Sequence, residues 1–139
     1  MAVVAVDRDR RATLVRQFRP AVGRALLEIP AGSRDVEGEP AEATARRELI
    51  EEAGLAADTL EELMAVFNTP GYCDQRTVLF LATGLSAVPT DRSGTEERYM
   101  TVETLSLDEV EDRVADGTLV DETTVLGLLA ARAALDRRR

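Results

Sequence analysis

The fold is decided by one stretch, residues 47–55, which reads Arg47-Glu48-Leu49-Ile50-Glu51-Glu52-Ala53-Gly54-Leu55. Residues three and four apart on a helix are neighbours, so Glu48 would lie beside both Glu51 and Glu52. Carboxylates that close repel each other unless something positive lies between them. Mg²⁺ is commonly held by a few carboxylates together with waters and substrate phosphates. The stretch therefore predicts a short acidic helix in an enzyme that uses a metal ion to act on phosphates.

The flanking residues predict where this helix begins and ends. The run Glu39-Pro40-Ala41 predicts the start, because proline is tolerated and acids are favoured near the first turn. Gly54 predicts the end, at the left-handed position that follows a last turn. Ala45, Leu49 and Ala53 repeat every four residues and would face the core, with the acids away from the centre of that stripe.

A strand and a turn are predicted just upstream of the helix. Residues 26–29 form a short, mainly apolar run that favours a strand. Pro30, Ala31 and Gly32 then turn the chain, and the glycine lets the backbone approach a ligand closely. Strand, turn and acidic helix together predict a cup for a cation and a diphosphate.

This arrangement resembles the Nudix hydrolases, whose signature is G-x5-E-x7-R-E-U-x-E-E-x-G-U, where U is a bulky aliphatic residue. The positions in register are Glu39, Arg47, Glu48, Leu49, Glu51, Glu52, Gly54 and Leu55. The front of the pattern departs, because six residues, 33–38, separate Gly32 from Glu39 instead of five. A loop insertion ahead of the helix leaves the acids in register. The alternative is an acidic helix face that is merely solvated.

Neighbouring segments resemble the ADP-ribose pyrophosphatases within that family. These segments are residues 16–20, residues 28–32 and the Thr-Pro-Gly loop at residues 69–74. The resemblance extends over about residues 3–128. Gln75 stands where those enzymes often have an acid. Many of them also have an extra N-terminal region that helps to build a dimer and the adenine pocket, whereas this sequence begins at the first core strand.

The resemblance implies a set of metal ligands. They are the main-chain carbonyl of Ala31 and the carboxylates of Glu48, Glu51 and Glu52, with Mg²⁺ or Mn²⁺ as the cofactor. Ions there would neutralise phosphoryl oxygens and lower the pKa of an attacking water.

Substrate contacts are expected from Arg16, Arg19, Gly32 and Pro70. The alternative for the two arginines is that they are solvated residues at a strand end. Arg47 is expected to pair with an acid and hold the helix in preference to binding phosphate directly. Glu39 is expected to orient the loop at the helix start.

The general base is expected in the loop before the final strand, as the resemblance implies. Glu97 is preferred there and Glu96 is close behind, because the strand beginning at Tyr99 would bring the preceding pair to the end of the sheet. The alternatives are that both acids only face solvent, or that the base lies within the helix at Glu51.

Composition restricts the function further. With 139 residues, 45 % of them hydrophobic and 31 % charged, the chain is expected to form one Nudix domain over residues 1–139. The absence of histidine excludes Ser-His and Cys-His nucleophilic pairs and leaves carboxylates for acid–base chemistry. A net charge of −9 argues against a nucleic-acid partner and makes a cation necessary for a diphosphate substrate.

The sequence also predicts where the protein is located. No stretch is long and apolar enough to cross a membrane, and no signal peptide is expected from Met1-Ala2-Val3-Val4. The single cysteine, Cys73, forms no internal disulfide and suits a reducing compartment, so a cytoplasmic location is expected. A packing or loop role is favoured for Cys73 over a nucleophilic one.

The pattern along the chain predicts an α/β fold with a mixed sheet. Strands are expected over residues 3–6, 13–18, 26–29, 63–68, 77–82 and 99–105, and helices over residues 107–115 and 122–135 as well as the acidic one. Helices on both faces of the sheet fit this order. The resemblance implies the same α/β/α sandwich and leaves a homodimer open.

Three classes of function remain open at this point. The first is hydrolysis of ADP-ribose to AMP and ribose 5-phosphate. The second is a Nudix hydrolase of nucleoside triphosphates or of another nucleotide sugar. The third is a non-catalytic protein that binds a nucleotide as a sensor; the intact acids of the helix argue against it.

Overall fold

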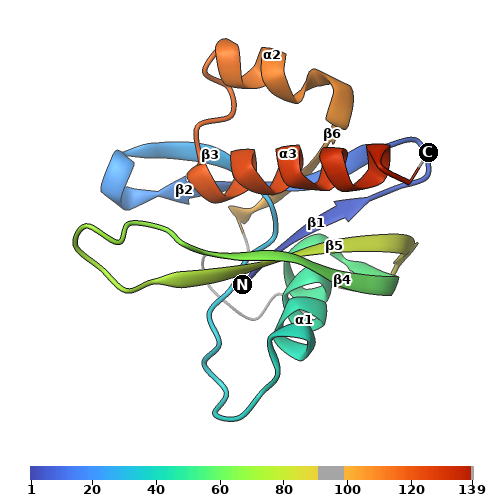
Figure 1. Cartoon of the computed structure of the whole chain (residues 1–139), viewed down its shortest axis with the longest axis horizontal. Helices are drawn as coiled ribbons and strands as arrows, with labels where there is room; N and C mark the ends of the chain where they lie inside the picture. The colour runs from blue at the N-terminus through green and yellow to red at the C-terminus, as the bar shows by residue number, and fades with distance from the viewer. Residues whose placement is uncertain (91–98, 139) are drawn as a thin grey trace.

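The computed structural model describes residues 1–90 and 99–138, which form one mixed sheet and the helices that cover it (Figure 1). The strands are β1 (Ala2–Val6), β2 (Arg11–Arg19), β3 (Arg24–Glu28), β4 (Leu55–Phe67), β5 (Arg76–Ala87) and β6 (Thr101–Ser106). The α-helices are α1 (Ala41–Ala53), α2 (Val110–Ala115) and α3 (Glu122–Asp136). Short 3₁₀ turns, η1 (Pro20–Val22) and η3 (Leu107–Glu109), follow β2 and β6.

Strand β2 organises the sheet because it pairs with three other strands. Its residues 11–16 pair with β6 along one edge. On the other edge, residues 12–13 pair with β1 and residues 15–19 pair with β3, all antiparallel. Strands β1 and β3 therefore lie along the same edge of β2, one after the other, and do not pair with each other. The sheet continues from β1 to β5, which is parallel to it, and then to β4.

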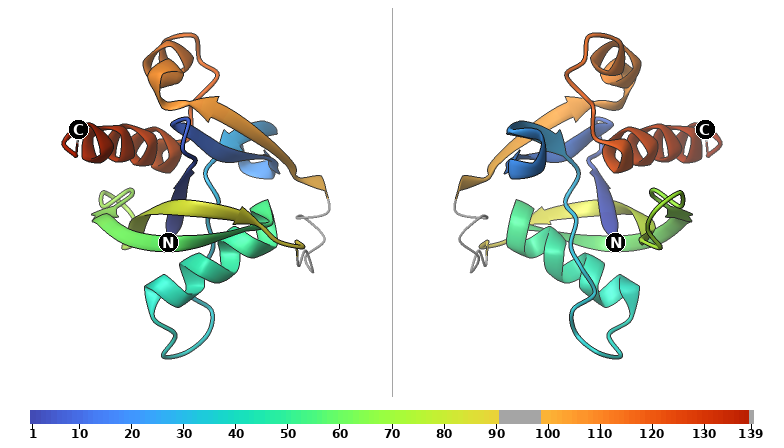
Figure 2. Two further views of the ribbon diagram at one scale, coloured as in Figure 1. Left: turned by 90° about the vertical axis from the view of Figure 1, so that its right-hand side faces the viewer. Right: turned by 90° about the vertical axis from the view of Figure 1, so that its left-hand side faces the viewer.

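Helices cover both faces of the sheet, as predicted (Figure 2). Helix α1 lies on one side, where Ala45 and Leu49 pack with Val3, Ala5 and Phe80. Helix α3 lies on the opposite side and packs on the larger core cluster through Leu128 and Ala131, both fully buried. Burying a leucine side chain contributes about 1.5–3 kcal/mol, so these two clusters fix both helices on the sheet. The mixed α/β arrangement expected from the sequence is confirmed.

Helix α1 has the predicted boundaries. Pro40 is its N-cap residue, and Gly54 follows the last turn in the left-handed conformation, with φ 64°. The amide of Gly54 donates to Ile50 O at 3.0 Å and closes that turn. Because β4 begins at Leu55, directly after this glycine, the acidic helix is joined to the edge of the sheet without a loop.

Strand β4 is longer than the sequence predicted. The expected strand began at residue 63, whereas β4 begins at Leu55 and pairs with β5 throughout, with an irregularity between Glu62 and Met64. Many of its side chains are exposed, so the apolar alternation that identifies a strand is weak there. The predicted turn at Pro70 and Gly71 does join β4 to β5.

Candidate active site

The turn at residues 30–32 is anchored to the start of β1. The amide of Val3 donates to Pro30 O at 2.8 Å, and the amide of Gly32 donates to Met1 O at 3.1 Å. Ala2 and Ala31 form an isolated antiparallel bridge at the same place. These contacts hold the turn at the point where β1 and β3 have separated, next to helix α1.

Two acids of α1 face this turn and are buried. A Cβ added to Gly32 would lie 2.1 Å from Glu48 Cδ, so only glycine leaves room for that carboxylate. The amide of Ala31 donates to Glu52 Oε2 at 3.0 Å. Glu48 is 8 % exposed and Glu52 is 6 % exposed. Since a solvated helix face would leave its acids exposed, this burial contradicts that alternative for these two acids.

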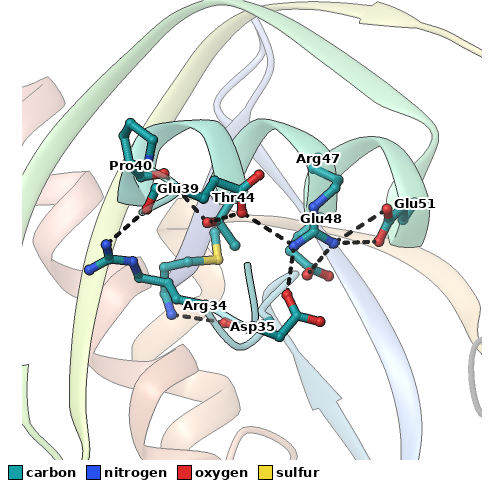
Figure 3. Close-up of polar contacts among 10 residues, drawn as sticks. Arg34, Asp35, Glu39, Pro40, Thr44, Arg47, Glu48 and Glu51 are labelled. Atoms are coloured by element: carbon teal, nitrogen blue, oxygen red, sulfur yellow. Dashed lines mark hydrogen bonds and ion pairs between the residues drawn. The ribbon is translucent and has the colours of Figure 1, made fainter. Parts of the chain in front are cut away.

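Arg47 contacts carboxylates on two sides (Figure 3). Its Nη1 lies 3.1 Å from Glu48 Oε1 and 3.2 Å from Glu51 Oε2, and its Nη2 lies 3.3 Å from Asp35 Oδ1 and 3.6 Å from Glu39 Oε2. Partial burial lowers the pKa of Arg47, but the charges of these glutamates outweigh it and the pKa lies above the ordinary value. The geometry favours the holding role expected for Arg47.

Glu39 also helps to fix the start of the helix. The hydroxyl of Thr44, which is fully buried, donates to Glu39 Oε2 at 2.6 Å. Arg34 Nη2 donates to the carbonyl oxygen of Glu39 at 2.8 Å, so Glu39 is held both by the loop before α1 and by the helix itself (Figure 3).

The acids provide the donor set that a hard cation needs. Within residues 1–90 and 99–138, no three carboxylate or thiol side chains converge as a ready set of metal ligands. The guanidinium of Arg47 instead contacts both Glu48 and Glu51. Carboxylate oxygens beside a tight glycine turn nevertheless match the oxygen ligands that Mg²⁺ and Mn²⁺ prefer. The chemistry of the residues present therefore fits a divalent cation.

A cavity of about 540 Å³ adjoins this turn. Gly32, Ala31 and Ser33 line one side of it, and Arg19 and Glu28 lie among its polar groups. Arg19 makes a two-point ion pair with Glu28, with Nε–Oε1 2.8 Å and Nη2–Oε2 2.6 Å. These hydrogen bonds raise the pKa of Arg19 against the effect of burial, and the charges of Asp121 and Glu52 raise it further. A permanent cation therefore borders the cavity.

Two of the residues predicted to contact the substrate, Arg16 and Pro70, do not line this cavity. Arg16 lies three residues before Arg19 on β2 and so projects from the other face of the strand. It forms an ion pair with Glu103, 2.6 Å away, and lines a separate, mainly apolar cavity of about 410 Å³ with Phe18 and Tyr99. Pro70 is exposed and is absent from the described lining of the first cavity.

The loop that carries Pro70 does reach the first cavity through another residue. Gln75 lines that cavity, together with Thr77 at the start of β5. Cys73 in the same loop is a free cysteine, and its Sγ shares a hydrogen bond of 2.8 Å with the hydroxyl of Thr69, which lowers the pKa of the thiol. The proposed bases Glu96 and Glu97 lie outside the described residues.

Sequence reasoning missed several polar residues of the cavity. Glu28 was placed in a strand without a role, although it is only 5 % exposed. Asp121 and Thr123, at the start of α3, were not singled out at all. Asp121 is the N-cap of α3, and an Asp shortly before an apolar helical run, here beginning at Val125, is a known start signal that could have located it in the sequence.

Comparison with known proteins identifies the family. A model described as the NUDIX domain matches residues 1–122. The chain belongs to the Nudix family. The resemblance to the Nudix hydrolases is thereby confirmed.

Relatives and a solved structure extend this comparison. An ADP-ribose pyrophosphatase of Mycobacterium tuberculosis is 40 % identical over 133 residues, covering 96 % of this chain and 64 % of the relative. An ADP-ribose pyrophosphatase of Bacillus subtilis is 34 % identical over 92 % of this chain and 69 % of its own length. This Nudix chain thus spans about two thirds of each relative. The crystal structure of an ADP compounds hydrolase has the same fold, with a TM-score of 0.85 and 24 % identity over 99 % of this chain and 73 % of that one.

Within residues 1–90 and 99–138, no helix is both long enough and apolar enough to cross a bilayer.

Proposed function

We propose that this Nudix protein hydrolyses the diphosphate bond of ADP-ribose to give AMP and ribose 5-phosphate. The observation that carries the proposal is the packing of Glu48 and Glu52 against the glycine turn, directly beside a cavity bordered by Arg19. Two relatives that match over most of the chain are named ADP-ribose pyrophosphatases, which supports the choice of substrate.

We propose that Glu48, Glu51, Glu52 and the carbonyl of Ala31 hold Mg²⁺ or Mn²⁺. A bound divalent cation would supply charge neutralisation at the diphosphate and lower the pKa of a water. The chain's own residues then orient this chemistry. Gly32 lets Glu48 approach the turn, the amide of Ala31 holds Glu52, and Arg47 keeps Glu48 and Glu51 on one side of the helix.

Arg19 and Glu97 complete the proposed assignment. Arg19 borders the cavity and would contact a phosphate or ribose oxygen of the substrate, held in place by its ion pair with Glu28. Glu97 is our first choice for the general base and Glu96 the second, from sequence alone. A homodimer, a cytoplasmic location and the absence of a nucleic-acid partner also stay predictions from the sequence.

A panel of substrates tests the proposal. The purified protein is incubated with nucleotide sugars and nucleoside triphosphates in the presence of Mg²⁺ or Mn²⁺, and the products are identified by mass. The expected result is AMP and ribose 5-phosphate from ADP-ribose. A preference for triphosphates or for another nucleotide sugar would support the second class of function. Tight binding of nucleotides without turnover would support a sensor.

A further inference from the structure

The buried hydroxyl of Thr124 joins helix α3 to the turn that faces the acids. The amide of Ile29 donates to Thr124 Oγ1 at 3.0 Å, across 95 positions of sequence. Thr124 is fully buried and Ile29 is 2 % exposed. Because a buried amide needs a hydrogen-bond partner, the Thr124 hydroxyl is the group that satisfies the Ile29 amide.

Asp121 fixes the direction of that hydroxyl. Asp121 Oδ2 accepts from both the amide of Thr124, at 2.8 Å, and its hydroxyl, at 2.7 Å. With its proton directed to Asp121, the hydroxyl presents a lone pair to the Ile29 amide. The N-cap residue Asp121 therefore begins α3 and also orients the hydroxyl that accepts the hydrogen bond from the Ile29 amide.

Ile29 is two residues before Ala31, whose amide holds Glu52. Pro30 between them is fixed to β1 by the amide of Val3, so little freedom remains in the connection. Thr124 and the carboxylate of Glu52 are thus connected through only three residues of backbone, 29–31.

We propose that Thr124, oriented by Asp121, is a positioning residue that holds the turn at residues 30–32 in register with the acids of α1. The inference rests on the proposed function, because it concerns the same metal and substrate site. It adds residues from the far end of the chain that lie outside the Nudix signature. Partners that orient ligands in this way typically change metal affinity or activity by about 10–100-fold when removed.

The test compares Thr124→Val, which removes the hydroxyl, with Thr124→Ser, which keeps it. Mn²⁺ binding is measured by electron paramagnetic resonance, and the amide resonances of Ala31 and Gly32 are recorded without metal. We expect Thr124→Val to weaken Mn²⁺ binding about 10-fold and to lower kcat about 10-fold, with KM for ADP-ribose changed less than about 2-fold. Thr124→Ser should keep Mn²⁺ affinity and kcat near their wild-type values, and its amide shifts at Ala31 and Gly32 should stay closer to the wild type than those of Thr124→Val.

A matched control separates positioning from general stability. Thr13 on β2 is another buried threonine, 7 % exposed, and Thr13→Val should leave Mn²⁺ affinity and both amides unchanged. If Thr124→Val fails to fold, the role of Thr124 is tested by comparing Asp121→Asn with Asp121→Ala. Asparagine keeps an acceptor for the Thr124 hydroxyl, whereas alanine does not. Asp121→Ala should then weaken Mn²⁺ binding while Asp121→Asn stays near the wild type.

Two results would overturn the inference and are distinct from failure of the proposed function. One is a folded Thr124→Val protein that binds Mn²⁺ as Thr13→Val does. The other is an unchanged pair of amides at Ala31 and Gly32. Failure of the proposed function would appear instead in the wild type, as an absence of turnover on every substrate, and the amide measurement would still decide the role of Thr124.

Discussion

The carboxylate of Glu48 occupies the space into which a side chain at residue 32 would project. A Cβ on Gly32 would meet Glu48 Cδ at 2.1 Å and Oε1 at 2.2 Å, far inside van der Waals contact. The turn and the acidic helix can therefore pack this closely only because residue 32 has no Cβ. The first glycine of the Nudix signature has a direct steric reason in this chain.

Gly32→Ala should inactivate the protein without unfolding it. The Glu48 carboxylate would have to swing away, so we expect turnover to fall by about 100-fold and stability by about 1–3 kcal/mol, as for other overpacked sites. Turnover on ADP-ribose and the midpoint of thermal unfolding measure the two effects. Gly71→Ala is the folding control, because nothing lies within 4 Å of a Cβ there. Wild-type turnover in Gly32→Ala would contradict the proposed role of Glu48.

The acidic helix and the side of it that carries the acids could be predicted from the sequence, because helical spacing determines which residues are neighbours. The positions of Pro40 and Gly54 and the core face through Ala45 and Leu49 all follow from local rules. Local rules do not say what packs on the other faces. The burial of Glu48 and Glu52 depends on a turn more than 15 residues away, and helical periodicity carries no information about it.

Non-local pairing explains the remaining misses. The buried carboxylate of Glu28 forms an ion pair with Arg19 on the adjacent strand, although the register between β2 and β3 places Val15 opposite Glu28, so strand pairing alone does not predict this contact. Thr124 contacts Ile29 across 95 positions, and no short motif predicts such a pair. The first half of β4 was missed because an edge strand needs few buried side chains, so its alternation is weak.

Removal of divalent ions should abolish activity. Crowded carboxylates on one helix need a cation before a diphosphate can approach an acidic protein, so excess EDTA should stop turnover and added Mg²⁺ or Mn²⁺ should restore it. The same ions should raise the midpoint of thermal unfolding, since a ligand at 100 times its Kd stabilises a folded protein by about 2.7 kcal/mol. Full turnover in excess chelator would reject the metal assignment.

Glu52→Gln should separate the role of the charge from that of the shape. Glutamine keeps an oxygen that accepts from the amide of Ala31, so the fold should survive. Loss of a charged ligand should lower turnover by at least about 100-fold and weaken Mn²⁺ binding. Glu42→Gln on the exposed side of the same helix is the matched control and should retain wild-type turnover. A soluble Glu52→Gln protein with near-normal turnover would argue against this ligand.

Arg19 needs a paired substitution to be tested fairly. Arg19→Gln alone leaves the buried carboxylate of Glu28 without its partner and should destabilise the fold, although by less than the loss of a fully buried pair, because the Arg19 side chain is 42 % exposed. Arg19→Gln combined with Glu28→Gln removes both charges and should be more stable than the single variant. If Arg19 contacts the substrate, the double variant should still raise KM for ADP-ribose by about 10-fold. A double variant with wild-type KM would assign Arg19 a structural role only.

Glu97→Gln tests the general base. If Glu97 activates the attacking water, its loss should lower kcat by about 10²–10⁴-fold with little change in Mn²⁺ affinity, because a base acts on the proton and leaves the ion in place. Glu96→Gln should then be mild, and the reverse pattern would transfer the role to Glu96. Small effects in both variants would move the base elsewhere, with Glu51 the next candidate.

Hydrolysis in ¹⁸O-labelled water gives a second readout, since the label should enter one phosphate of one product and identify the phosphorus that is attacked. Release of free adenine, or of inorganic phosphate alone, would reject cleavage between the two phosphates.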